Sequence, residues 1–451
     1  MRRLSLVFLA LPGVLAAQTA RPANLTRIDS IVSAELRKNH VPGASVAVVS
    51  HGELVVAKGY GQENVEAGTR ASAETIYRIG SLTKQFTALG IMQLVEQGKV
   101  GLDDEITKYL PDFPTQGHKV TVRHLLTHTS GIHNYTALGP KVWNETFRVD
   151  QTNEQMIALF KDVPFDFSPG ERYGYSNSAF FLLGVIIEKV SGLPYPKYLK
   201  ERILEPLGLR STSYCDNRAI VPHRSQGYEV DGGDVVNAAP MSMTTPGAAG
   251  AICSTVVDLV AWQRAFNDAK LISPASRDAM RTAATLNDGK KTSYGFGLGV
   301  GEFEGHRSVS HSGGINGFIS WLGHFPNDDL SIAVLTNTGS GPAPRIGQLI
   351  ARVVLGIPLP TIKDLAIDAT ERAQAVGTYD LGQIKLVVRA VGDRIEAQLG
   401  PQPPTRLMSQ GGGEYRAESD TDIVLRFQTT QGVAGVVIEI QGTTLRGNRQ
   451  P

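Results

Sequence analysis

The amino-acid sequence predicts a mixed α/β (α+β) region followed by a small all-β domain. Within the first region, apolar residues recur at helical spacing after Ser81, whereas short runs of β-forming residues lie near both of its ends. After about Ile367, short β runs alternate with Gly, Asp or Asn. The chain of 451 residues is 41% hydrophobic, which is enough for two or three domains with full cores.

The N-terminus has the pattern of a secretory signal. Met1-Arg2-Arg3 precedes an apolar run from Leu4 to Ala17, with small residues near Ala16–Ala20. We therefore expect a signal peptide over residues 1–20 and an exported protein, periplasmic or secreted. The run is short for a bilayer and Pro12 interrupts it, so no stable membrane span is expected.

Charge gives little indication of a macromolecular partner. The formal net charge is +1, so neither nucleic acid nor an acidic surface is predicted as a partner. The pattern does not address the oligomeric state.

Hairpins are predicted at both ends of the first region. The runs Ala44–Val49 and Leu54–Tyr60 flank a turn at His51-Gly52, and Ile319–Phe325 and Leu330–Thr336 flank a turn at 327–329. The alternation of Gly with apolar residues in Tyr294–Val300 predicts another strand. Helices are expected from Asn24 or Thr26 to about Lys38, after Ser81 to near Gly98, and at 103–110, 121–126, 178–190 and 254–266, and a helix followed by a loop is expected within 199–212.

The stretch around Ser81 carries the first chemical pattern. If a helix begins at Gly80–Ser81, Lys84 lies one turn further along the same face. The serine hydroxyl would then lie near unpaired backbone N–H groups, with an amine able to take its proton, as a serine nucleophile requires. Ser-x-x-Lys is a loose pattern that also arises by chance, but it occurs once here and two further elements follow it.

Two histidines four residues apart, His124 and His128, have metal-ligand spacing. The zinc-protease pattern needs Glu after the first His, and Leu125 stands there instead. We therefore expect structural histidines, no metal and no cofactor.

The second element is Tyr175-Ser176-Asn177, ahead of an apolar helix stopped by Gly192. Ser176 or Asn177 would serve as the helix N-cap on the simplest interpretation. Alternatively, Tyr175 and Asn177 project toward Ser81. A phenol beside an ammonium is a possible general base, and an amide can bind a carbonyl or hold Lys84.

The third element is His311-Ser312-Gly313-Gly314. Its glycines let the backbone approach a ligand, and an edge strand here could donate an N–H to an oxyanion while Ser81 donates its own. A glycine-rich hairpin without further function is the competing interpretation.

Two features lie outside these elements. Cys215 and Cys253, the two cysteines, could form one disulfide or remain buried thiols, and the sequence does not decide between them. The predicted domains are 21–357, a linker at 358–367 opened by Pro358 and Pro360, and a β domain at 368–451, for which a barrel is one candidate architecture.

Taken together, the three elements resemble the serine β-lactamase and DD-peptidase superfamily over about residues 25–355. The branch most similar comprises class C β-lactamases, DD-carboxypeptidases with a His-x-Gly third motif, family VIII esterases and D-aminopeptidases. His124–Gly131, Ser168-Pro169-Gly170 and Pro206-Leu207-Gly208 are also similar to stretches of that superfamily. The part past residue 367 resembles the lipocalin-like domain that follows some of these hydrolases.

This resemblance implies a β-lactamase/transpeptidase-like antiparallel sheet flanked by helices, beside a helical lobe. It implies Ser81 as nucleophile, and Lys84 and Tyr175 as sharing the role of base. It implies that Asn177, His311, Ser312 and Gly313 bind substrate, and that the N–H groups of Ser81 and Gly314 form the oxyanion hole. Which of Lys84 and Tyr175 is the base stays open.

One departure bears on substrate. β-Lactamases usually have Lys where this chain has His311, and a neutral imidazole attracts a substrate carboxylate less strongly. The hypothesis is an exported serine hydrolase that cleaves a D-amino-acid peptide, a β-lactam or a small ester through an acyl-enzyme on Ser81. The alternative is a penicillin-binding or scaffolding relative without significant turnover. An α/β-hydrolase is excluded because Gly-x-Ser-x-Gly does not occur.

Overall fold

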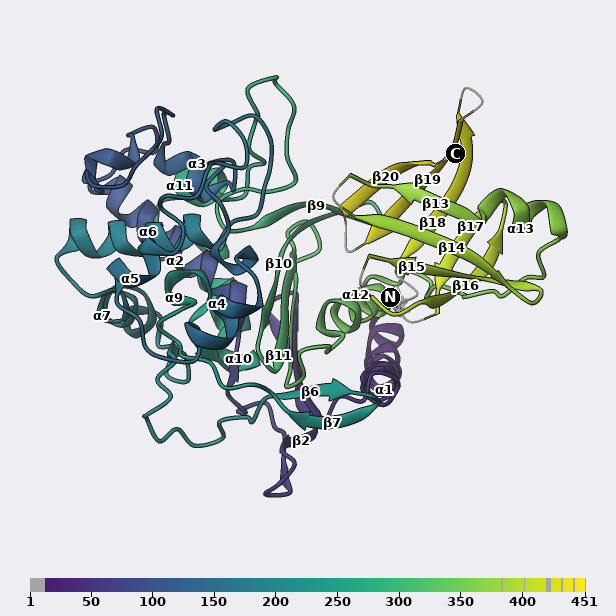
Figure 1. Cartoon of the computed structure of the whole chain (residues 1–451). Helices are drawn as coiled ribbons and strands as arrows, with labels where there is room; N and C mark the ends of the chain where they lie inside the picture. Colours follow the sequence, from purple (N-terminus) through teal and green to yellow (C-terminus); the bar gives the residue numbers. More distant parts are fainter. Residues whose placement is uncertain are drawn as a thin grey trace, which may run out of the picture. The chain divides into compact units, whose positions relative to one another are not determined.

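The computed structural model describes residues 13–382, 384–400, 402–418, 423–430, 433–440 and 443–450. The chain divides into two compact units, Met1–Ile357 and Pro358–Pro451 (Figure 1). The N-terminal part of the predicted signal peptide, residues 1–12, lies outside the described residues.

A seven-stranded antiparallel sheet forms the centre of the first unit, in the order β3-β2-β1-β12-β11-β10-β9. Its strands are β1 (Gly43–Ser50), β2 (Glu53–Asn64), β3 (Thr69–Arg70), β9 (Gly299–Phe303), β10 (His306–Ile315), β11 (Phe318–Phe325) and β12 (Leu330–Thr336). Because β1 pairs with β12, the two ends of the unit meet in the middle of the sheet. This confirms the predicted antiparallel sheet.

Both predicted hairpins form. At the β1–β2 turn His51 and Gly52 have φ of 50° and 74°, as a two-residue hairpin turn of the right twist requires. Asp329 has φ of 44° in the β11–β12 turn.

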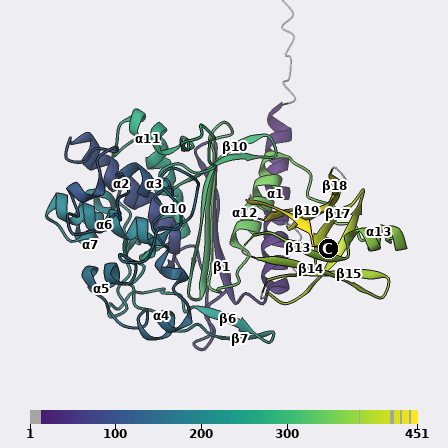
Figure 2. The ribbon, with the colours of Figure 1, turned by 45° about the horizontal axis from the view of Figure 1, so that its top comes forward.

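Helices cover the sheet on both faces (Figure 2). One face carries α1 (Gly13–Lys38) and α12 (Ala343–Leu355), and α10 (Val256–Asn267) packs on β1 and β12 from the other. The buried residues of α12 recur at helical spacing, at Ala343, Ile346, Gly347, Ile350, Ala351 and Val353. β12 is buried along its whole length, which is the pattern of a strand covered on both faces.

A helical lobe lies beyond α10, where α2 packs against α6 and α9. Its helices and single turns are η1 (Gly80–Leu82), α2 (Thr83–Glu96), η2 (Ile106–Lys108), α3 (Val122–Leu126), η3 (Tyr135–Ala137), α4 (Pro140–Glu145), α5 (Asn153–Ala158), α6 (Asn177–Ser191), α7 (Tyr195–Leu199), η4 (Lys200–Leu204), α8 (Glu205–Leu207), α9 (Gly247–Gly250) and α11 (Pro274–Met280).

Two small sheets join the lobe to the main sheet. One has the order β4-β8-β5 and the other pairs β6 with β7. Their bounds are β4 (Tyr77–Arg78), β5 (Ser213–Tyr214), β6 (Tyr228–Asp231), β7 (Asp234–Asn237) and β8 (Ile252–Ser254). Since β4 ends three residues before Ser81, β8 anchors the segment that leads into the site.

The second unit is a closed eight-stranded barrel, which confirms the predicted all-β domain. Helix α13 (Ala369–Ala375) precedes strands β13 (Gly377–Asp380), β14 (Lys385–Val391), β15 (Arg394–Leu399), β16 (Thr405–Gly411), β17 (Glu414–Ala417), β18 (Val424–Thr430), β19 (Val433–Ile440) and β20 (Thr443–Arg449). Tyr379 and Tyr415 are buried and pack on Phe427, so the barrel has an aromatic core of its own.

Three element predictions are corrected. The first helix begins at Gly13 and not at Asn24 or Thr26, since residues 13–23 include four alanines, the residue with the strongest helix propensity. The helix expected at 103–110 is only the single turn η2. The strand expected over Tyr294–Val300 is wrong for most of its length, because the chain turns at Gly297 (φ 69°) and β9 begins at Gly299.

We also compared helix length and hydropathy with the thickness of a bilayer. No single helix among the described residues is long and apolar enough to cross a membrane. The bent pair Asn177–Ser191 and Tyr195–Leu207 meets the test by length and composition only.

Candidate active site

Ser81 lies in the tight turn η1, directly before α2. The turn lies against β10: Gly80 has φ of 51°, and a Cβ added there would be 2.9 Å from the carbonyl oxygen of Gly314. Two hydrogen bonds fix the preceding residue, since Ile79 donates its N–H to Ile252 O (2.9 Å) and accepts from Ser320 Oγ (2.8 Å). A side chain at position 80 would therefore push Ser81 away from β10.

The Ser81 hydroxyl is hydrogen-bonded to two of the predicted residues. Lys84 Nζ lies 3.0 Å from Ser81 Oγ, and Tyr175 donates its O–H to the same oxygen at 2.8 Å. The ammonium or amine of Lys84 also lies 4.8 Å from the centre of the Tyr175 ring. The structure thus brings Ser81, Lys84 and Tyr175, which are 94 positions apart at most, into one cluster.

Lys84 is completely buried. Besides Ser81, its Nζ contacts Asn177 Oδ1 and the carbonyl oxygen of Ala249, both at 2.8 Å. Burial holds the pKa of Lys84 well below its usual value, and no carboxylate among the described residues forms an ion pair with it. A neutral lysine has two N–H groups and one lone pair. When Lys84 is neutral, the two acceptors Asn177 and Ala249 can take both N–H groups, which leaves the lone pair for the Ser81 hydroxyl.

Tyr175 and Asn177 lie at the start of α6. Ser176 is the N-cap of that helix, as one interpretation predicted, and its Oγ accepts the N–H of Ala179. Capping and the site are therefore compatible, because the cap residue lies between the two that face Ser81. Burial raises the pKa of Tyr175, while the hydrogen bond with Ser81 acts weakly in the opposite direction. The phenol therefore stays protonated at neutral pH.

The His311–Gly314 segment of β10 lies beside the Ser81 turn. Gly313 fits closely, because a Cβ there would lie 2.1 Å from Ile79 O and 3.0 Å from the N of Ser81. Gly314 and Ser312 are exposed. An added Cβ on Gly80 would be 3.0 Å from Gly314 N, so the N–H groups of Ser81 and Gly314 belong to neighbouring backbone segments.

His311 is buried and neutral. Its Nδ1–H donates to Ser312 O (2.5 Å), which leaves Nε2 to accept the O–H of Tyr294 (2.7 Å). Burial, and then the nearby Lys84, lowers the pKa of His311 to about 4. His311 therefore does not supply the positive charge of the Lys that β-lactamases usually have there.

Two residues of the site escaped the sequence analysis, Tyr294 and Ala249, whereas His128 was expected to be a structural histidine. Tyr294 lay in the stretch taken for a strand, and a backbone carbonyl such as that of Ala249 leaves no signal in a sequence. His128 is buried in left-handed backbone (φ 56°), with its ring 4.2 Å from that of Tyr175.

The His124/His128 pair does not form a metal site. His124 is part of the N-cap of α3, where its Nδ1 accepts the N–H of Thr121 (3.2 Å). His128 Nδ1 accepts the N–H of Ser176 (3.2 Å). Across the part of the chain that the structure describes, no group of three or more His, Cys, Asp or Glu could hold a metal ion.

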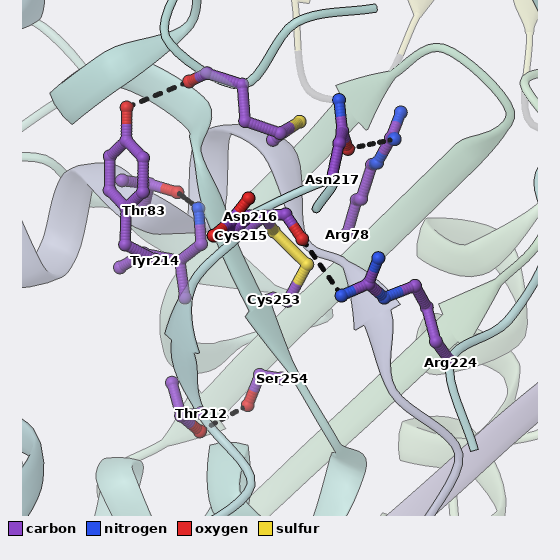
Figure 3. Close-up of a disulfide and its surroundings, with 12 residues drawn as sticks. Arg78, Thr83, Thr212, Tyr214, Cys215, Asp216, Asn217, Arg224, Cys253 and Ser254 are labelled. Carbon is purple, nitrogen blue, oxygen red and sulfur yellow. Dashed lines mark hydrogen bonds between the residues drawn. A yellow bond between two sulfur atoms is a disulfide. The ribbon is translucent and has the colours of Figure 1, made fainter. Parts of the chain in front are cut away.

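The two cysteines form a disulfide between the end of β5 and β8 (Figure 3). The Cα atoms of Cys215 and Cys253 are 5.3 Å apart. Because Cys253 pairs in register with Arg78, the disulfide fastens the strand that leads to Ser81.

A serine held by a lysine and a tyrosine, between an antiparallel sheet and a helical lobe, defines the class of serine β-lactamases and penicillin-binding proteins. The family model for Beta-lactamase matches residues 28–355. The chain therefore belongs to the beta-lactamase family.

Among curated proteins, Protein flp of Staphylococcus aureus (strain MRSA252) is 31% identical over 326 residues, which is 71% of this chain. The match spans 64% of the length of that relative. Among solved structures, the octameric penicillin-binding protein homologue from Pyrococcus abyssi has a TM-score of 0.71 and 28% identity, with 94% of this chain and 100% of that chain covered. A D-stereospecific amidohydrolase from Streptomyces sp. has a TM-score of 0.62 and 28% identity, covering 74% and 97% of the two chains.

Proposed function

We propose that this protein is a serine hydrolase that cleaves amides of D-amino acids through an acyl-enzyme on Ser81. One observation carries the proposal: Ser81 Oγ lies 3.0 Å from Lys84 Nζ and 2.8 Å from the hydroxyl of Tyr175. The similarity to a D-stereospecific amidohydrolase favours D-amino acid amides, with β-lactams and small esters as further candidate substrates.

Lys84 is the better candidate for the base. Its pKa is lowered, so the neutral amine is accessible, whereas the pKa of Tyr175 is raised. Ser81 would give its proton to Lys84 and attack the carbonyl carbon. The N–H groups of Ser81 and Gly314 would receive the developing oxyanion.

Tyr175 is the candidate acid. As the bond to the leaving group breaks, its phenol would protonate the leaving nitrogen or oxygen and recover the proton held by Lys84. A water molecule then attacks the ester on Ser81, and the same groups return the serine to its starting state. His311 would act by supporting Tyr294 and the cleft wall as a neutral group.

We also propose that the protein is exported, to a periplasm or outside the cell. The pattern of the first 20 residues supports this, as does the disulfide, which is typical of oxidising compartments. N-terminal sequencing of protein recovered from the periplasm or medium of an expressing bacterium tests it. A start near residue 21 is expected, and an intact Met1 in the cytoplasmic fraction would contradict it.

The test of the activity is labelling of the full chain with a fluorophosphonate and, separately, with a penicillin, read by intact mass and peptide mapping. We expect a fluorophosphonate adduct on Ser81 and none in Ser81→Ala, with Ser213→Ala, a change at an exposed serine of β5 outside the site, as the control that keeps its label. Hydrolysis of D-alanine amide but not of L-alanine amide would then support the substrate class.

The alternative is a penicillin-binding or scaffolding relative. A stable penicillin adduct on Ser81 without turnover of amides or esters would support it. The complete hydrogen-bonded set around Ser81 favours the enzyme.

A further inference from the structure

A polar cavity opens beside the disulfide. Its volume is about 400 Å³, which is within the range of small-molecule sites. Its lining residues come from β4, β8, the β10–β11 turn and the loops after α4, β5 and β7, and none of them belongs to the Ser81 cluster.

Three arginines from separate segments line this cavity: Arg78, Arg148 and Arg224. Arg78 follows Tyr77 in the strand that leads to Ser81, Arg148 follows α4, and Arg224 lies in the loop after β5. We call it the arginine cavity. Figure 3 shows Arg78 and Arg224 extending toward the segment that follows Cys215.

Each arginine keeps its charge without a carboxylate partner among the described residues. Arg78 donates to Asn217 Oδ1 (3.0 Å), and its guanidinium lies 5.8 Å from the Phe318 ring. Arg224 donates to the carbonyl oxygens of Asp216 (2.9 Å) and Ala219 (2.8 Å).

All these acceptors are neutral, so they satisfy hydrogen bonds without compensating charge. Burial, and then the charge of Arg224, lowers the pKa of Arg78, which shows that the two cations disfavour each other. Arg148 is exposed, and no hydrogen bond or ion pair of its side chain is found in the described chain.

One acidic residue, Asp216, also lines the cavity. Its Oδ1 accepts the backbone N–H of Arg218 at 2.7 Å. Three positive side chains against one negative leave the lining with a surplus of two positive charges. A guanidinium has five N–H donors in a planar fork, so Arg78 and Arg224 keep donors for a ligand.

We propose that the arginine cavity is a binding site for a small anion, with a carboxylate as the best match. A carboxylate is planar, pairs with a guanidinium through two parallel hydrogen bonds and neutralises half of the surplus charge. Its location next to the strand before Ser81 and the turn after Gly314 suits two sources, a carboxylate of the substrate itself or a separate small anion.

The substrate source rests on the proposed hydrolase function. To keep the two questions apart, every variant is first labelled with a fluorophosphonate at Ser81. Loss of labelling in the unchanged protein would remove the hydrolase proposal but leave anion binding testable.

Kinetics of two matched esters test the substrate source. p-Nitrophenyl valerate and the p-nitrophenyl monoester of glutaric acid have the same chain length, but only the second carries a carboxylate. We expect Arg148→Gln to raise KM for the anionic ester about tenfold, with little change in kcat and none for the neutral ester. Arg224→Lys, which keeps the charge but not the fork, should give a smaller rise.

Calorimetric titration with succinate tests the second source. Binding by the unchanged protein and about tenfold weaker binding by Arg148→Gln, without an effect on either ester, would support a site for a separate anion. Arg218→Gln is the matched control, since Arg218 is an exposed arginine like Arg148 and lies on the loop that carries Asp216 and Arg224, but does not line the cavity.

The proposal is overturned if the protein neither prefers the anionic ester nor binds succinate, or if Arg218→Gln has the same effect as Arg148→Gln. Arg148→Gln is informative in every case, because no contact of the Arg148 side chain has to be broken to make it.

Discussion

The Ser81 cluster and the arginine cavity both contain buried or half-buried basic side chains, but the charge state of these side chains differs between the two. Lys84 is surrounded by neutral acceptors and is driven toward its uncharged form. Arg78 and Arg224 also contact neutral acceptors, but a guanidinium remains charged under any physiological condition. The same kind of surrounding therefore yields a proton acceptor in one region and an anion-binding site in the other.

Replacing Lys84 by arginine breaks this comparison most directly. Arg keeps a permanent charge and has no lone pair to take the Ser81 proton, so kcat/KM should fall by about 10³-fold or more. Lys189→Arg, an exposed change at the end of α6, is the matched control. Activity within tenfold of the unchanged protein in Lys84→Arg would mean that Lys84 is not the base.

The pH profile gives a second measure of the same site. The neutral amine is the active form and its pKa is lowered, so kcat/KM should rise with pH and level off well below pH 10.5. A rate that still rises above pH 10 would assign the base role to Tyr175.

Tyr175→Phe should have a smaller effect. It removes the O–H that donates to Ser81 and the proposed leaving-group acid, but Lys84 and its acceptors stay in place. We expect kcat to fall about 10²-fold, with the acid limb of the pH profile unchanged. A larger loss for a leaving group of high pKa than for p-nitrophenolate would support the acid role. Equal losses for both would oppose it.

Ser81, Lys84, Tyr175 and Asn177 of the candidate site could be predicted from the sequence because each of them belongs to a short local pattern. Ser81 and Lys84 share one helical turn, and Tyr175, Ser176 and Asn177 start one helix. Tyr294 and Ala249 act through partners far along the chain, His311 in the first case and Lys84 in the second. The arginine cavity escaped for the same reason, since its three arginines come from three segments.

In the fold, too, the elements with a strong local sequence pattern were predicted and those that depend on distant neighbours were not. Strongly apolar runs such as Leu330–Thr336 were predicted within a residue or two. In the second domain the sequence predicts β runs at 377–379, 384–389, 394–399, 415–418, 423–428 and 433–440, but not strands β16 and β20. Thr405–Gly411 and Thr443–Arg449 are polar and contain Gly, Arg or Asn, and they acquire strand structure from their neighbours in the closed barrel. The strand predicted over 294–300 was wrong because Gly alternating with apolar residues has the same period as a strand. In the structure Gly297 has a positive φ, which lets it pass the backbone of Lys84.

Buried histidines are a third kind of side chain in this comparison. Burial lowers the pKa of an imidazole and keeps it neutral, as it does for Lys84, but His324 has no proposed role in the reaction. His324 is 4% exposed and makes its hydrogen bonds outside the Ser81 cluster, with Leu330 and Ser331, and burial, followed by the charge of Arg281, lowers its pKa to about 4. Between pH 6.5 and about 4 the unfolded chain therefore binds a proton that the folded chain excludes. The free energy of unfolding should fall as pH decreases through this window, by about 1.4 kcal/mol per pH unit for this residue.

In urea unfolding measured from pH 6.5 to 4, His324→Gln should remove the contribution of this histidine to the pH dependence of the free energy of unfolding. The variant should keep kcat/KM at neutral pH within about twofold. His311→Gln should reduce the slope similarly but also lower kcat/KM, because it breaks the contact with Tyr294 beside the cleft. Equal slopes in all three proteins would mean that these histidines are charged in the folded state. A lowered pKa of Lys84 would then reflect the particular surroundings of its amine, and not a general effect of burial in this protein.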